Sequence, residues 1–299
     1  MANDGKDRTE YMLERRLESL DPALNRRVKD TGLVLSRILD RFKILFPEYT
    51  DHTLLHCMTV IDFCNVLIGR EQIDMMNADE IYVLLSACYL HDSGMGLRRE
   101  EYEEFKSLLP CDEYMESHPG STLSDVVREF HHEFSGFFIK KYADLLDIPS
   151  PEHTHAIVQV SRGHRRTDLM DESEYPSEFE VPGGNKICLP YLSSLIRMAD
   201  EIDVVASRNP ILLYDIDDLT DEIEILEHKK VKAVKSLITN KEEFIMVVST
   251  EDDEVYRELL HVRDKMQKTL DYCRKVADER TPYTITQKRV EITTLGGQD

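Results

Sequence analysis

The stretch Tyr89-Leu90-His91-Asp92-Ser93-Gly94 sets a histidine beside an aspartate where an apolar helix runs into glycine. Residues 77–88 predict that helix, because Asn77 can cap it and Glu80 can reach back to the cap. His91 shares a face with apolar residues three, four and seven positions before it. An ionisable pair at a buried helix end is costly unless something compensates it, as a bound cation would. The alternative is a capped helix end with a hydrogen-bonded histidine, so the question is whether the rest of the chain supplies further ligands.

Composition limits the classes of protein that this chain can be. It has 299 residues, of which 41% are hydrophobic and 32% charged, which is typical of a soluble globular protein with one large domain or two modest ones. Since no stretch approaches the roughly 20 apolar residues of a membrane helix and the N-terminus is polar, we expect neither a membrane span nor a secretory signal. The formal charge of −21 disfavours binding to duplex nucleic acid. Six cysteines without a CxxC pair favour a reducing cytoplasm.

Histidines recur on the inward faces of other predicted helices. In the helix expected over residues 52–69, His56 lies on the apolar face, whereas His52 lies one turn earlier, near the mouth of any pocket. The helix expected over residues 122–146 begins with a capping box and carries His131 on its apolar face, with His132 at the edge of a pocket. A single inward histidine is more often a hydrogen-bonded core residue than a ligand.

A further helix begins at Ser150-Pro151, with serine as the cap and proline in the first turn. It closes with Arg162-Gly163-His164-Arg165-Arg166, a cationic cluster in an otherwise acidic chain. Arg162, Arg165 and Arg166 either neutralise the helix C-terminus or bind phosphate, and the sequence leaves both readings open. After a predicted loop over residues 167–186, a helix over residues 190–207 places Asp200 where core residues are expected.

The character of the chain changes after residue 210. Two strand-like segments, 230–238 and 244–250, surround Asn240-Lys241 and predict a hairpin. They are followed by a charged helix over residues 252–279 and a β-branched segment up to residue 294. We therefore expect a mainly α fold with three parts: a charged segment over residues 1–30 with a solvated helix over residues 8–20, a helical domain over 31–210, and a small α+β appendage over 211–299.

Together, the helices offer one set of inward metal-ligand side chains: His56, His91, Asp92, His131 or His132, His164 and Asp200. Imidazole and carboxylate ligands suit Mn, Fe, Zn, Ni or Co, and Mg where waters complete the shell. Five helices that each bury an ionisable group are hard to explain without a compensating charge. The sequence therefore predicts a site for one or two divalent metal ions.

This pattern resembles the HD-domain superfamily of metal-dependent phosphohydrolases, in which a histidine, a His-Asp pair and a distal aspartate lie on a helical bundle. His56, His91-Asp92 and Asp200 match those positions in order and spacing over roughly residues 30–210. His131, in the arrangement His-x-x-x-Ser-Gly, and His164 are similar to the extra histidines of members with two metals. The Gly-Tyr-Pro tripeptide of the cyclic-dinucleotide branch is absent.

The segments 51–56, 131–135 and 162–164 look most like a bacterial branch often joined to chaperone-type ATPase modules. No such module is present in this sequence. The resemblance implies a fused or partner ATPase module, and we then expect the chain to end at the edge of a longer protein. A homo-oligomer is the alternative.

The resemblance also implies hydrolysis of a phosphoester or phosphoanhydride in a small phosphorylated substrate, a nucleotide in particular. Asp92 would bridge two metals, and His131 and His164 would complete the second metal or act as proton donor and phosphate ligand. His52, His132 and the three arginines would bind substrate, and Asp203 or Arg208 would orient ligands. Two alternatives stay open: a sensor or interaction module that binds a nucleotide without turnover, and a di-iron oxygenase.

Overall fold

The computed structural model describes residues 12–39, 54–204 and 222–295, which are mainly helical, with a small β-sheet near the C-terminal end, as predicted. In chain order the elements are α1 (Met12–Leu20), α2 (Pro22–Leu39), α4 (Leu54–Ile73), α5 (Ala78–Leu90), η1 (Ser93–Gly96), α6 (Arg99–Phe105), η2 (Lys106–Leu108), α7 (Cys111–Ser117), α8 (Leu123–Tyr142), α9 (Pro151–Arg162), β1 (Phe179–Glu180), β2 (Lys186–Ile187), α10 (Leu189–Glu201), α11 (Glu222–Ala233), β3 (Val234–Thr239), β4 (Glu243–Val248), α12 (Asp253–Arg280) and β5 (Arg289–Thr294).

Local capping signals set where the site-bearing helices begin. The amide N–H of Glu80 donates to the side chain of Asn77 over 3.0 Å, and the Asn77 amide donates back to the Glu80 carboxylate over 3.1 Å. A second capping box opens α8 at Thr122, and Ser150 caps α9. These three predicted helix starts are confirmed, because each depends on side chains only three residues apart.

Other predicted boundaries and environments differ from the structure. The helix expected near the N-terminus is present from Met12, but Leu13 and Leu17, one turn apart, are fully buried, so it is not fully solvated. The predicted division at residue 30 falls inside α2. The helix expected to reach residue 207 ends at Glu201, and the segment 230–233, expected as strand, is the last turn of α11.

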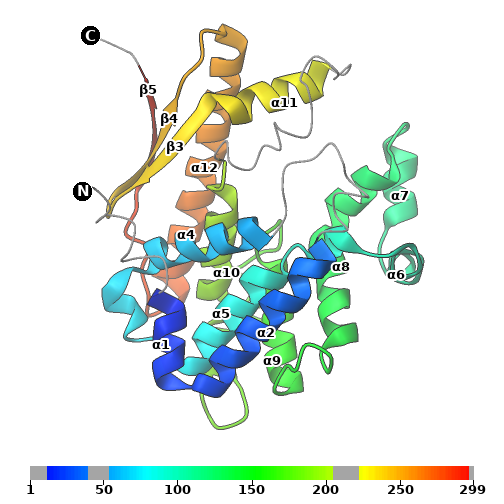
Figure 1. Ribbon diagram of the computed structural model, residues 1–299, viewed down its shortest axis with the longest axis vertical. Helices are drawn as coiled ribbons and strands as arrows, with labels where there is room; N and C mark the ends of the chain where they lie inside the picture. Colours follow the sequence, from blue (N-terminus) through cyan, green and yellow to red (C-terminus); the bar gives the residue numbers. More distant parts are fainter. Residues whose placement is uncertain (1–11, 40–53, 205–221, 296–299) are drawn as a thin grey trace.

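Helix α5 is the centre of the helical region (Figure 1). Eleven of its thirteen residues are buried, and it packs against α1, α2, α4, α9 and α10. Helix α8 packs on α9 and on the short helix η1 that follows α5. In α4 the helical backbone breaks at Gly69, where φ is +69°, near the predicted end of that helix. The two residues that follow the last turn of α5, His91 and Asp92, are buried as well.

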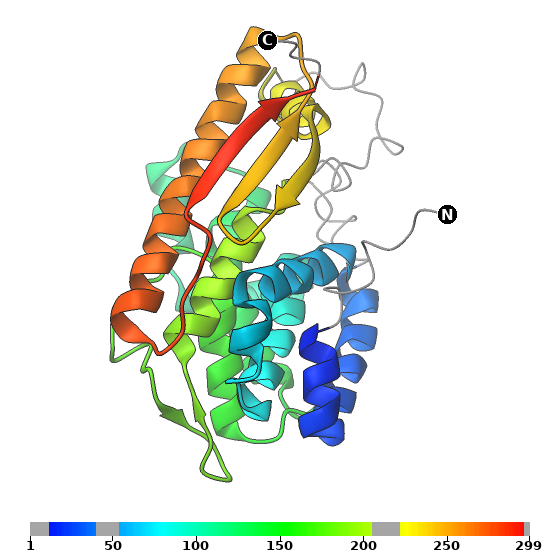
Figure 2. The same cartoon turned by 90° about the vertical axis from the view of Figure 1, so that its left-hand side faces the viewer.

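The three-stranded sheet has the order β3-β4-β5 (Figure 2). The predicted hairpin is present, with β3 antiparallel to β4, and β5 then pairs with β4 in parallel, so that Val290 lies opposite Phe244. Helix α12 connects these two parallel strands, lies against α10, and buries the predicted face that contains Leu259, Met266, Leu270 and Cys273. Phe244 and Val290 of the sheet belong to the same apolar cluster as the helical region.

Among the described residues, no helix combines the length and the apolar character that crossing a membrane requires.

Candidate metal centre

The predicted ligands come from five separate elements and meet at the C-terminal end of α5. His56 lies in the first turn of α4, His91 follows the last residue of α5, and Asp92 precedes η1. His131 lies in the middle of α8, His164 just after α9, and Asp200 in the last turn of α10. Five of these residues are buried, namely His56, His91, Asp92, His131 and His164. The Asp200 side chain is 23% exposed, so it lies at the open side of the site.

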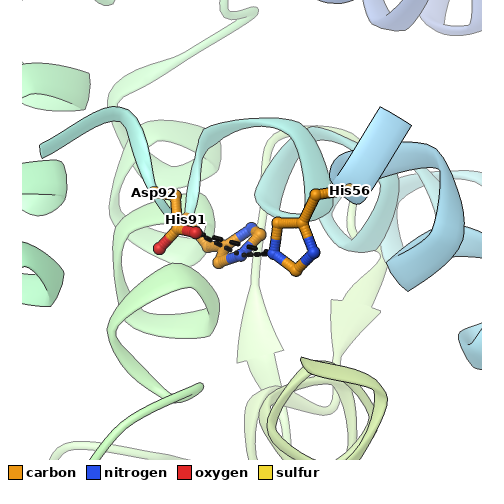
Figure 3. A group of neighbouring side chains, drawn as sticks. All are labelled: His56, His91 and Asp92. Atoms are coloured by element: carbon orange, nitrogen blue, oxygen red, sulfur yellow. Dashed lines mark hydrogen bonds and ion pairs between the residues drawn. The ribbon is translucent and has the colours of Figure 1, made fainter. Parts of the chain in front are cut away.

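The first group of side chains consists of His56, His91 and Asp92 (Figure 3). The Nε2 atoms of the two histidines are 3.2 Å apart, and Asp92 Oδ2 lies 3.5 Å from His56 Nε2 and 3.3 Å from His91 Nε2. Asp200 Oδ1 approaches the same two nitrogens at 3.3 and 3.9 Å. Four potential ligand atoms therefore surround one position.

The second group consists of Asp92, His131 and His164. Here the other carboxylate oxygen of Asp92, Oδ1, lies 3.4 Å from His131 Nε2 and 3.8 Å from His164 Nε2. The two imidazole nitrogens are 2.9 Å apart. Asp92 therefore belongs to both groups, with one oxygen directed toward each.

All four histidines are oriented through the ring nitrogen that points away from the centre. His56 Nδ1 lies 2.7 Å from Asp203 Oδ2, and the Nδ1 atoms of His91, His131 and His164 lie 2.9, 2.6 and 2.5 Å from main-chain carbonyl oxygens. Because these partners only accept hydrogen bonds, each Nδ1 carries a hydrogen, which leaves Nε2 as the ring atom that can offer a lone pair to a metal ion. Nδ1–H donation to a carboxylate or carbonyl is the arrangement that metal-binding histidines adopt.

The convergence of these lone pairs tests whether the residues fit a metal. With Nδ1 protonated, two Nε2 lone pairs would face each other at 3.2 Å in the first group and at 2.9 Å in the second, a repulsion that a cation between them removes. Imidazole nitrogen and carboxylate oxygen are the ligands that divalent transition metals take from proteins. The donor set therefore fits one divalent cation in each group.

Burial keeps the histidines of the second group neutral. It lowers the pKa of His131 to about 4, against the opposing effect of the Asp92 carboxylate. Burial, together with the neighbouring His91 and His131, also brings the pKa of His164 well below its ordinary value. Neutral imidazole is the form that binds metal, so neither ring has to lose a proton near pH 7.

His132 does not join either group. Its ring lies edge-on to that of His131, with the centroids 5.9 Å apart, and its Nε2 is 3.7 Å from Glu133 Oε1. Its position beside the site, and not in it, agrees with the helical periodicity that favoured His131 as the inward residue. His52 and Arg208 lie outside the described residues.

The three arginines after α9 differ in what their guanidinium groups contact. Arg162 donates to both carboxylate oxygens of Glu133 at 2.6–3.0 Å and also pairs with Glu174. Arg166 pairs with Glu129 at 3.0 Å. Arg165 is half-buried and makes no ion pair with any residue that the structure describes. Of the predicted phosphate-binding arginines, Arg165 is therefore the one whose charge is not already balanced by a carboxylate in the described structure.

Sequence reasoning missed the carbonyl oxygens that orient three of the histidines. They belong to Cys88, Arg128 and Ser161, and each lies three residues before the histidine that it holds. That constant spacing was visible in the sequence, because a helical side chain can reach back to the preceding turn. The interaction of Asp203 with His56 joins residues 147 positions apart, so its partner could not be read from local spacing.

A helical domain with two buried His/Asp groups suited to divalent cations is what an HD-type domain would present. A family model described as HD-CE matches residues 46–283, and the chain belongs to this HD-CE family. The matched span includes α12 and passes through the predicted division at residue 210. No curated protein and no solved structure matches the chain significantly. The predicted association with an ATPase module stays a prediction.

Proposed function

We propose that this protein is a metal-dependent phosphohydrolase that acts on a nucleotide or a related small phosphoester or phosphoanhydride. The observation that carries the proposal is the position of Asp92. Its two oxygens face two different pairs of histidines, at 3.3–3.5 Å on one side and 3.4–3.8 Å on the other. A carboxylate shared in this way suits two neighbouring divalent ions. Two-metal sites are common among phosphatases and nucleases.

The chain supplies the ligands and their orientation. His56, His91, Asp92 and Asp200 would hold the first ion, and Asp92, His131 and His164 the second. Such ions lower the pKa of a bound water and polarise phosphoryl oxygens. Asp203 and three main-chain carbonyls keep the imidazoles directed inward, so the ligand geometry exists before substrate arrives.

Charge at the site favours an anionic substrate once both ions are bound. Asp92, Asp200 and Asp203 contribute three negative charges, and two divalent ions contribute four positive ones, which leaves a local excess of one. The guanidinium of Arg165 adds a second positive charge nearby. With a single ion and Arg165 the sum is zero, so attraction for phosphate depends on filling both groups.

Metal content and phosphate release test this function together. Protein purified without chelator and loaded with Mn²⁺ should hold two ions, and His131→Ala should hold one. The wild type should release inorganic phosphate or a nucleoside monophosphate from one or more members of a nucleotide panel, and Asp92→Ala should lose both metal and turnover. An active Asp92→Ala protein that holds no metal would contradict the proposal.

Two alternatives use the same side chains. In a nucleotide-binding sensor, the loaded protein would bind a nucleotide stoichiometrically and release no product during long incubation. In a di-iron oxygenase, the protein would be coloured when loaded with iron, would consume oxygen, and would be inactive with Mg²⁺ or Mn²⁺. The nucleotide panel, together with binding stoichiometry and oxygen uptake, therefore separates the three functions.

A further inference from the structure

We propose that Ser135 is the positioning residue that sets the distance between the two metal-binding groups. The inference rests on the proposed two-metal site. Ser135 follows His131 by one helical turn in α8 and is fully buried. Its hydroxyl does not point toward either group; it joins α8 to the main chain on both sides of Asp92.

The hydroxyl of Ser135 makes two hydrogen bonds. It donates to the carbonyl oxygen of His91 over 2.5 Å and accepts from the amide N–H of Gly94 over 2.8 Å. His91 and Gly94 lie immediately before Asp92 and two residues after it. One side chain of α8 therefore holds both ends of the short segment that carries the shared carboxylate.

Close contact between main chains adds to this connection. A Cβ atom built on Gly94 would lie 2.3 Å from the His131 carbonyl oxygen and 2.6 Å from the Ser135 nitrogen. Only glycine allows that approach, because real Cβ atoms do not come so near to main-chain atoms. The segment after His91 consequently lies directly against the turn of α8 that contains His131.

This connection bears on the two groups unequally. His131 depends on α8 for its place 3.4 Å from Asp92 Oδ1. In the first group, by contrast, His56 and Asp200 come from α4 and α10, which Ser135 does not join. Loss of the hydroxyl should therefore loosen the second group while the first keeps its ligands together.

Ser93 provides a matched control. It lies between Asp92 and Gly94 and is as fully buried as Ser135, but its hydroxyl donates to the Leu90 carbonyl over 2.8 Å, within its own turn. Ser93→Ala and Ser135→Ala each remove one buried hydroxyl from the same region. Only Ser135→Ala removes a connection between α8 and the segment around Asp92.

The experiment measures how many Mn²⁺ ions each protein binds and the two dissociation constants. Electron paramagnetic resonance then detects whether the two ions form an exchange-coupled pair. The proteins compared are wild type, Ser135→Ala, Ser135→Cys, Ser93→Ala and Gly94→Ala. For Ser135→Ala we expect the second dissociation constant to rise about 10- to 100-fold and the pair signal to fade, with the first constant nearly unchanged. Ser135→Cys should fall between Ser135→Ala and wild type, and Ser93→Ala should resemble wild type. Gly94→Ala should reproduce the Ser135→Ala pattern, because its added Cβ pushes the same two segments apart.

Three outcomes would overturn the inference. The first is a Ser135→Ala protein that keeps both constants and the pair signal. The second is equal loss of both ions, or a failure of both Ser135→Ala and Gly94→Ala to fold, which would mean a general packing role. The third is equal loss of the second ion in Ser135→Ala and Ser93→Ala, which would trace the effect to burial alone. A wild-type protein that binds no Mn²⁺ would instead contradict the proposed function, so the two failures are distinguishable.

Discussion

Asp203 allows a direct test of how the first group is oriented. Of the four site histidines, His56 is the one whose Nδ1 partner is a side chain, since the other three donate to main-chain carbonyls that substitution cannot remove. Asp203→Asn keeps the size of the group but removes its charge and lets the amide turn its NH₂ toward the ring. The substitution should therefore weaken metal binding without removing a metal ligand.

The expected size of the effect follows from the geometry. The contact between His56 Nδ1 and Asp203 Oδ2 is short, 2.7 Å, and both groups are about 2% exposed, so solvent does not screen the interaction. Removal of such an outer partner typically costs 10- to 100-fold in metal affinity, which corresponds to about 1.4–2.8 kcal/mol. The loss should fall on the ion held by His56, His91, Asp92 and Asp200.

The assay is titration of metal-free protein with Mn²⁺ or Zn²⁺, monitored by calorimetry, with Asp79→Asn as the matched control. Asp79 makes a similar contact, 2.8 Å from its Oδ1 to the buried His153 Nε2, but away from the metal ligands, and its other carboxylate oxygen accepts from the exposed Asn185. Asp79→Asn should leave both metal affinities unchanged. If Asp203→Asn also left both unchanged, the idea that this carboxylate orients His56 for metal would be refuted.

Three further predictions concern stability. Leu17→Ala should lower the free energy of unfolding in urea by about 2–5 kcal/mol because Leu17 is fully buried, whereas Leu20→Ala, at a residue that is 41% exposed, should change it by less than about 0.5 kcal/mol; equal effects would contradict the packing of α1. Burial alone would raise the pKa of Asp79, but hydrogen bonds from His153 and Asn185 bring it below its ordinary value. Its contribution to stability is therefore complete above about pH 4 and lost as the pH falls through the lowered pKa, so the stability difference between wild type and Asp79→Asn should shrink in acid; a difference that grows in acid would contradict this sign. Metal at about 100 times its dissociation constant should stabilise the fold by roughly 2.7 kcal/mol in thermal melts, EDTA should reverse the gain, and Asp92→Ala should show none.

Features that depend on neighbours in sequence were predictable. The capping boxes at Asn77 and Thr122 need only residues three apart, and the inward position of His131 relative to His132 follows from helical periodicity. The metal-binding pattern was also accessible, because each ligand lies in a short motif and the motifs occur in the order typical of HD domains. These local signals were sufficient for the fold class and for the side chains that meet at the end of α5.

Features that depend on distant partners were not predictable. Arg162 reads as a candidate phosphate-binding residue until Glu133, 29 residues earlier, is seen to occupy its guanidinium. The parallel pairing of β5 with β4 joins segments separated by the whole of α12. The burial of one side of α1 is a different case, because the spacing of Leu13 and Leu17 does predict it. The prediction of a solvated helix was wrong because it followed the composition of α1, in which charged residues outnumber the two buried leucines.

Helix α12 has a consequence for how the molecule unfolds. It contains 28 residues and is therefore about 42 Å long, enough to lie beside β5 and also beside α10. Its buried residues Met266 and Leu270 share one apolar cluster with Phe244 of the sheet and with α5. Melting of the sheet would therefore expose part of the apolar core that the sheet shares with the helical region. We expect calorimetry to show a single cooperative transition, with the sheet and the helices lost together.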